Sequence, residues 1–139
     1  MHSDQTSLEA AIARQVDEAL APDWESVRFE VALAGNVTSG MLYVKRDGQE
    51  EPEFPPSGIS RRLKELKQMT AQPEAGAWLS LTMNLAPSGG LDISYNFDEK
   101  PSFGFEISAR DYELELERFP RAEEAVPVWW RERIARRDA

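Results

Sequence analysis

Apolar and polar residues alternate most regularly along residues 79–85 and 91–97. The apolar positions are Leu79, Leu81, Met83, Leu85, Leu91, Ile93, Tyr95 and Phe97, and mostly Ser, Thr, Asn and Asp lie between them. A period of two is typical of strands with one buried face, and residues 87–90 favour a turn. The pattern predicts an antiparallel hairpin with one apolar and one polar face.

A similar pattern occurs earlier in the chain, where Val27, Phe29, Val31 and Leu33 alternate with other residues. Turn-forming residues follow at 35–40, so residues 26–46 are predicted to form a first hairpin. The facing of its second strand stays open, because Met41, Leu42, Tyr43 and Val44 are all apolar.

Helical spacing of apolar residues predicts helices over 6–21 and 58–70, a third from Ser108 to Arg118 and a last one from about Pro127. Candidate N-caps are Thr6, Ser7, Ser57 and Ser108. In the second helix, Ile59, Leu63, Leu66 and Met69 form the expected buried stripe, and Arg61, Arg62, Lys64 and Lys67 the expected solvated face.

Residues 47–57 contain three prolines and four acids and are interpreted as a loop. The order α-ββ-α-ββ-α-α predicts one α+β domain over residues 1–139. Its mainly antiparallel sheet has four strands, with Phe103, Phe105 and Ile107 on a candidate fifth edge strand, and helices pack on one face.

Composition narrows the classes of function. The 139 residues include no cysteine and 41% apolar residues, and the formal net charge is −9. An acidic surface repels nucleic acid and anionic lipid, so neither is an expected partner. The sequence contains no run of about 20 apolar residues, which a membrane-spanning helix would need, and residues 1–5 lack the features of a signal peptide. A cytoplasmic location is expected.

No catalytic or metal-binding set stands out in the sequence. The only histidine, His2, lies at the terminus, where chains are usually poorly ordered. Glu50, Glu51 and Glu53 lack the spacing of a calcium loop, and the glycines at 89–90 are not followed by a helix. The sequence predicts neither an enzyme nor a bound cofactor.

The polar face of the second hairpin is the first candidate partner-binding surface. It contains Ser80, Thr82, Asn84, Asp92, Ser94 and Asn96, with Asp98 and Glu99 at its rim and the acidic segment Glu50, Glu51 and Glu53 as an extension. Trp130, or its neighbour Trp129, is the competing site, because adjacent helical residues cannot both face inward. A third interpretation is that this face is only hydrated.

Residues 78–85, a turn, residues 91–98 and Pro101 resemble the central hairpin of the YezG-like antitoxin/immunity family. Residues 111–121 and 126–130 resemble the closing segment of its actinobacterial members; Asn96 departs from the family, in which an acid is usual. The resemblance implies a non-catalytic immunity protein that binds the C-terminal toxin domain of a polymorphic toxin system. A small-ligand-binding or regulatory interaction domain is the alternative.

Overall fold

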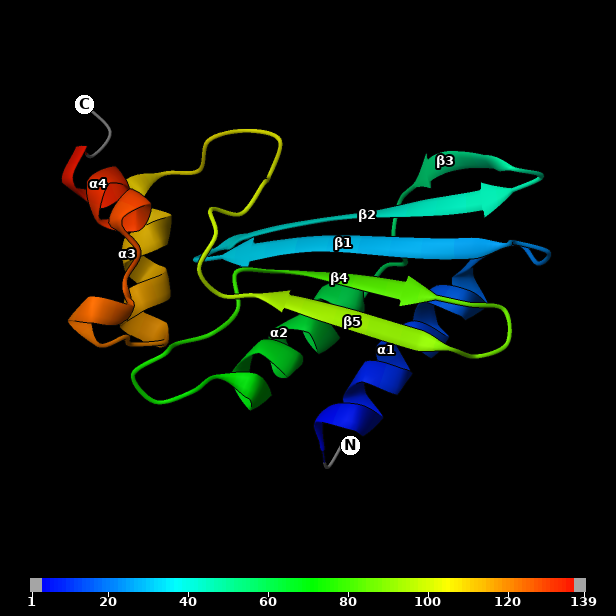
Figure 1. Cartoon of the computed structure of the whole chain (residues 1–139), viewed down its shortest axis with the longest axis horizontal. Coiled ribbons are helices and arrows are strands. Elements are labelled where there is room, and N and C mark those ends of the chain that lie inside the picture. The colour runs from blue at the N-terminus through cyan, green and yellow to red at the C-terminus, as the bar shows by residue number, and fades with distance from the viewer. Residues whose placement is uncertain (1–3, 137–139) are drawn as a thin grey trace.

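The computed structural model describes residues 4–136 (Figure 1). The elements are α1 (Gln5–Ala19), β1 (Ser26–Ala34), β2 (Val37–Arg46), β3 (Gln49–Glu53), α2 (Ile59–Thr70), β4 (Ser80–Leu85), β5 (Leu91–Asn96), α3 (Ala109–Arg118), the 3₁₀ helix η1 (Glu123–Ala125) and α4 (Val128–Arg136). His2 lies outside the described residues.

The described chain forms a five-stranded antiparallel sheet in the order β3-β2-β1-β4-β5. Helices α1 and α2 pack beneath one face of this sheet, and α3 and α4 lie at one end of it (Figure 1). The opposite face carries no helix. The predicted α+β class, with helices α1 and α2 on the apolar side of the strands, is confirmed.

The prediction of a loop over 47–57 is wrong for residues 49–53, because Gln49–Glu53 forms strand β3, and is confirmed for residues 47–48 and 54–57. This strand pairs with β2 from Arg46 opposite Gln49 to Leu42 opposite Glu53. Since β3 lies at an edge, it bonds on one side only, and this arrangement tolerates the missing N–H of Pro52. The candidate strand at 103–107 does not form, so β3 is the fifth strand.

The facing of β2 is decided by its register with β1. Leu42 lies opposite Phe29 and Val44 opposite Val27, and all four side chains are buried in the main core with α1 and α2. Met41 and Tyr43 therefore point to the open face. Two residues that were expected on the buried apolar face lie elsewhere. Leu79 packs in a second hydrophobic cluster, and Leu91 is 38% exposed at the hairpin turn.

The second hydrophobic cluster lies where α3 and α4 meet the end of the sheet. Trp130 is fully buried there beside Tyr112, with 6.0 Å between ring centroids. The expectation that Trp130 contributes to a partner surface is therefore wrong. Its neighbour Trp129 is partly exposed and donates a hydrogen bond from Nε1 to the Asp98 carbonyl at 2.7 Å.

Helix N-termini follow local capping chemistry, with two differences from the sequence prediction. The Ser108 hydroxyl accepts from the Asp111 amide at 3.1 Å, and this predicted cap of α3 is confirmed. For α1 the cap is Asp4 rather than Thr6 or Ser7. For α2, Gly58 in a left-handed conformation precedes the first turn and Ser57 does not cap it. Glycine adopts this conformation without a Cβ clash.

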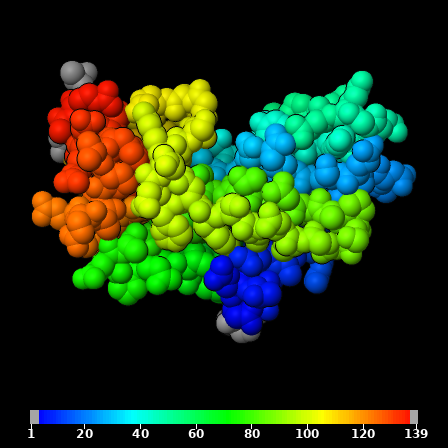
Figure 2. Space-filling model, viewed as in Figure 1, coloured from blue at the N-terminus to red at the C-terminus, as the bar shows by residue number. Residues whose placement is uncertain are grey.

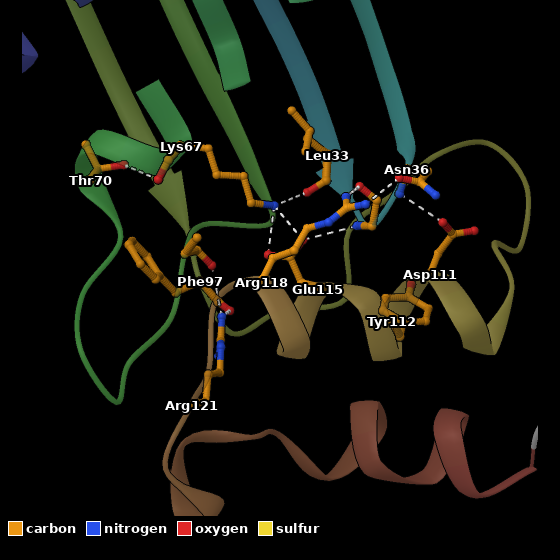
Figure 3. A network of polar contacts seen from close by, with 12 residues as sticks. Leu33, Asn36, Lys67, Thr70, Phe97, Asp111, Tyr112, Glu115, Arg118 and Arg121 are labelled. Carbon is orange, nitrogen blue, oxygen red and sulfur yellow. Dashed lines mark hydrogen bonds and ion pairs between the residues drawn. The ribbon is translucent and has the colours of Figure 1, made fainter. Parts of the chain in front are cut away.

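A buried ion pair joins α2 to α3 (Figure 3). Lys67 is 1% exposed, so its predicted place on a solvated face is wrong. Its Nζ lies 2.8 Å from Glu115 Oε2 and donates to Glu115 Oε1 at 2.9 Å and to the Leu33 carbonyl on β1. The amide of Gly35 donates to the same carboxylate at 3.1 Å. Burial lowers the pKa of Lys67, and the Glu115 carboxylate opposes this effect.

Arg121 is a second buried cation, and it fastens the segment after α3 to the sheet. Its guanidinium donates to the carbonyls of Phe97 at 2.6 Å, Ala77 at 3.1 Å and Ala125 at 3.0 Å. It also lies 4.7 Å from the ring centroid of Trp130. Because these carbonyls come from distant parts of the chain, one side chain fixes the position of the C-terminal helices against the hairpin.

Candidate functional site

The open face of the sheet presents rows of side chains set by strand register. Residues opposite one another in antiparallel strands point to the same side. One row contains Tyr43, Arg28, Asn84 and Asp92, the next Met41, Glu30, Thr82 and Ser94, and the third Ser39, Ala32, Ser80 and Asn96. The face is therefore mostly polar, with short hydroxyl side chains at its centre.

The segment between β5 and α3 turns this face into a groove. Figure 2 shows the surface hollowed between that segment, in yellow, and strands β2 and β3, in cyan. The cavity measures about 370 Å³, and its lining residues are Glu30, Val31, Ala32, Ser39, Met41, Tyr43, Ser80, Leu81, Thr82, Ser102, Phe103 and Gly104. Four hydroxyl-bearing Ser and Thr side chains and one phenol thus surround a shallow groove with apolar patches.

An ion-pair cluster lies at the rim of the groove and is centred on Arg28. The guanidinium Nε donates to Glu30 Oε2 at 2.8 Å, and NH1 donates to Glu50 Oε2 at 2.9 Å. The same guanidinium lies 4.5 Å from the ring centroid of Tyr43. These bonds, chiefly the one to Glu30, raise the pKa of Arg28 above its ordinary value. Two carboxylates share one cation, so the cluster keeps a net charge of −1.

Glu30 is the only residue with a formal charge among the described residues that line the groove. Its Oε2 accepts from Arg28, whereas no donor in the described part of the chain reaches its Oε1. One carboxylate oxygen therefore remains open to a ligand.

The structure places five of the expected residues of this face together on the open side of the sheet: Ser80, Thr82, Asn84, Asp92 and Ser94. Asn96 shares the face but has an internal role. Its amide nitrogen donates to Ser80 Oγ at 2.8 Å and to the Glu99 carbonyl at 3.0 Å, and its oxygen accepts from the Glu99 amide. A carboxylate at this position could not donate the first two bonds, which explains how an amide fits here.

Asp98 and Glu99 lie beyond the end of β5 rather than along the groove. The Asp98 carboxylate accepts from Arg121 at 3.2 Å, and its carbonyl accepts from Trp129. Asp98 therefore stabilises the junction with the C-terminal helices. Only one oxygen of the Asp98 carboxylate accepts from Arg121, and its side chain is 78% exposed, so its contribution to an acidic rim stays a prediction.

Strand alternation divides the acidic segment at 50–53. Glu50 lies opposite Lys45 and belongs to the open face, where it binds Arg28. Glu51 and Glu53 lie opposite Val44 and Leu42 and therefore point to the helix side of the edge. Glu53 accepts from Arg46 at 2.8 Å. The three acids cannot extend one rim as a flexible loop would have allowed.

The sequence interpretation missed Arg28, Glu30 and Tyr43. A signal was available for the first two, since Arg28 and Glu30 alternate with the buried Val27, Phe29 and Val31. For Tyr43 no such signal is present, because residues 41–44 are all apolar and show no alternation. Only the pairing of Tyr43 with Arg28 in the folded sheet shows that its side chain points to the open face.

Three further observations concern the described residues. Two aromatic side chains are strongly exposed. Phe54, 85% exposed, directly follows β3 in the sequence, and Phe105, 63% exposed, lies in the segment that forms one wall of the groove. Within residues 4–136, no three His, Cys, Asp or Glu side chains are grouped to hold a metal ion. None of the helices in this range has the length and apolar character needed to cross a membrane.

No protein-family model matches the chain, and a comparison with curated proteins found no match either. The functional interpretation therefore depends on the geometry of the open face and on the resemblance of the sequence motifs.

Proposed function

We propose that this protein is an immunity protein that binds a cognate toxin domain through the open face of its sheet and blocks it without catalysis. The observation that supports this most is a helix-free sheet face hollowed into a groove of about 370 Å³. Protein-binding surfaces commonly combine exposed aromatic residues with a polar rim. The resemblance of the central hairpin to YezG-like immunity proteins supplies the class of partner.

Charge also supports a protein partner of basic character. The chain carries a formal net charge of −9, and such a field accelerates association with a basic partner. Asp92, exposed on β5, adds a carboxylate to the open face across from Asn84. Short hydroxyl side chains near it lose little conformational entropy when a partner orders them.

A small-ligand-binding domain is the second candidate, because the groove volume lies at the lower end of the range for ligand pockets. Such pockets are mostly apolar and enclosed, however, whereas this groove is shallow and rich in hydroxyl groups. The two functions differ in what they require: a toxin partner needs the whole face, and a small ligand needs only the groove.

The direct test is co-expression with a candidate toxin domain, which is sought among the products of the neighbouring genes. We expect wild-type protein to restore growth and to elute with the toxin as one complex in gel filtration. The variant Asp92→Lys should fold normally and associate more slowly, most clearly at low salt. The matched variant Glu18→Lys, on the exposed surface of α1, should associate at nearly the wild-type rate. Continued killing without a complex would exclude the proposal.

A further inference from the structure

The geometry points to the groove as an arginine-recognising site: it takes a guanidinium presented by the partner protein, with Glu30 as its carboxylate. This inference rests on the proposed function, because it assigns the arginine to the toxin domain.

The charge inside the groove selects a cation. Glu30 provides the only formal charge among the described lining residues, and its Oε1 has no partner there. Since Arg28 is shared between Glu30 and Glu50, a second cation would balance the cluster. An anionic ligand would be repelled by the Glu30 carboxylate, whose charge Arg28 only shares with Glu50, and is disfavoured.

The neutral lining groups favour a guanidinium over an ammonium. A guanidinium offers five N–H donors in one plane, whereas an ammonium is a compact charge with three donors. Ser39, Ser80, Thr82 and Ser102 line the groove together with Glu30, and each hydroxyl can accept a hydrogen bond. Several hydrogen-bond acceptors around one carboxylate therefore match a guanidinium, whose N–H donors point outward in one plane, better than an ammonium.

The apolar part of the groove suits the rest of an arginine side chain. Met41 and Phe103 belong to the lining, and Ala32 lies at its base on β1. Long basic side chains pack their methylene groups on apolar surface while the charged end is hydrogen-bonded. The exposed Phe105 directly follows the lining residue Gly104 in the chain and offers further apolar surface to a partner loop that projects one arginine into the groove.

The first experiment measures affinity for the toxin domain with Glu30→Gln, which keeps side-chain shape and removes the charge. We expect the dissociation constant to rise roughly tenfold to hundredfold, as for loss of a charge-assisted hydrogen bond. Thr82→Val, which removes a hydroxyl with little change in volume, should give a smaller rise. The control Glu18→Gln changes net charge equally on the exposed surface of α1 and should stay within about twofold.

The second experiment tests the groove without the toxin. Two-dimensional amide NMR is recorded with N-acetyl-arginine amide as the probe and N-acetyl-citrulline amide, its neutral isostere, as the control. We expect saturable shifts at residues 30–32, 80–82 and 102–104 with the arginine probe only, and their loss in Glu30→Gln. Melting temperature confirms that each variant is folded.

The outcomes separate the two proposals. Toxin binding that is insensitive to Glu30→Gln, or equal shifts with both probes, overturns the arginine site and leaves the immunity function standing. Absence of a toxin complex with wild-type protein overturns the immunity function. If no toxin complex forms but the arginine probe alone shifts the groove residues, the groove still recognises a guanidinium and its partner is a different protein. If those shifts are also absent, the arginine site is overturned as well.

Discussion

The variant Glu115→Gln tests whether the buried ion pair fastens α3 to the rest of the domain. Glutamine keeps one oxygen for the Gly35 amide, but it removes the negative charge and replaces the other oxygen, which lies 2.8 Å from Lys67 Nζ, with an N–H donor. Lys67 is then left as a buried cation at 1% exposure. Breaking one side of a buried ion pair typically costs about 3–5 kcal/mol. The nearby rings of Trp78 and Phe119, each with its centroid 5.5 Å from Nζ, offset only part of this loss.

Neutralisation of Lys67 limits the part of that cost that comes from its buried charge. The variant can always fold with Lys67 neutral, and pH 7 lies about 3.5 pH units below the ordinary lysine pKa of 10.5. At about 1.36 kcal/mol per pH unit, neutralisation costs about 4.8 kcal/mol at pH 7 and about 2 kcal/mol at pH 9. The expected loss of stability is therefore about 3 to 5 kcal/mol at pH 7 and smaller at pH 9.

The sign of this pH dependence follows from proton linkage. Burial lowers the pKa of Lys67 in the folded state, and the variant lacks the carboxylate that opposes this effect. Between the lowered folded pKa and 10.5 the unfolded chain binds more protons, so stability rises with pH in that window. The gap between Glu115→Gln and wild type should narrow from pH 7 to pH 9.

Urea unfolding followed by tryptophan fluorescence measures both quantities. The control is Glu117→Gln on the same helix, where the ion pair with Arg110 is exposed by 57% and 60% at its two side chains. Such a pair contributes about 0 to 1 kcal/mol. A loss below about 1 kcal/mol in Glu115→Gln, or a loss that does not change between pH 7 and pH 9, would refute the reasoning.

Three further predictions concern the core, the α3 contact and alkaline pH. Leu81→Ala, at a 2% exposed position, should cost about 2–5 kcal/mol in urea unfolding, and Ile93→Ala, which is only partly buried, should cost less; equal stability of both variants and wild type would contradict the register. Gly35→Ala should destabilise more than Gly48→Ala. Both glycines have positive φ, but only at Gly35 would a Cβ clash with a backbone oxygen, that of Asp111 on α3. Equal melting temperatures for the two would exclude close packing there. Burial raises the pKa of Tyr112 to about 12. The unfolded chain therefore loses this proton first, and the free energy of unfolding should fall as pH rises from 10 towards 12. Melting curves at alkaline pH should show a weaker fall for Tyr112→Phe, and the same dependence of melting temperature on pH as in wild type would contradict this.

Local sequence determined the elements whose signals are contained within a few residues. The second hairpin follows from alternation on both sides of a short turn, and its register places Leu81 opposite Tyr95 as that alternation requires. The cap of α3 follows from Ser108 three residues before Asp111. The polar composition of one hairpin face also indicated which side of the sheet stays uncovered.

Tertiary structure decided the features that depend on a remote partner. Strand β3 forms because β2 supplies hydrogen bonds at an edge where Pro52 needs none, and composition alone favours a loop there. Lys67 has a lysine's ordinary preference for water. It is buried only because Glu115, 48 residues later, and the Leu33 carbonyl compensate its charge. Likewise, the groove exists only because the segment after β5 comes back across β1 and β4, so the role of Glu30 could not be deduced from its neighbours in sequence. Burial of a polar group depends on partners that only the folded chain brings within hydrogen-bonding distance.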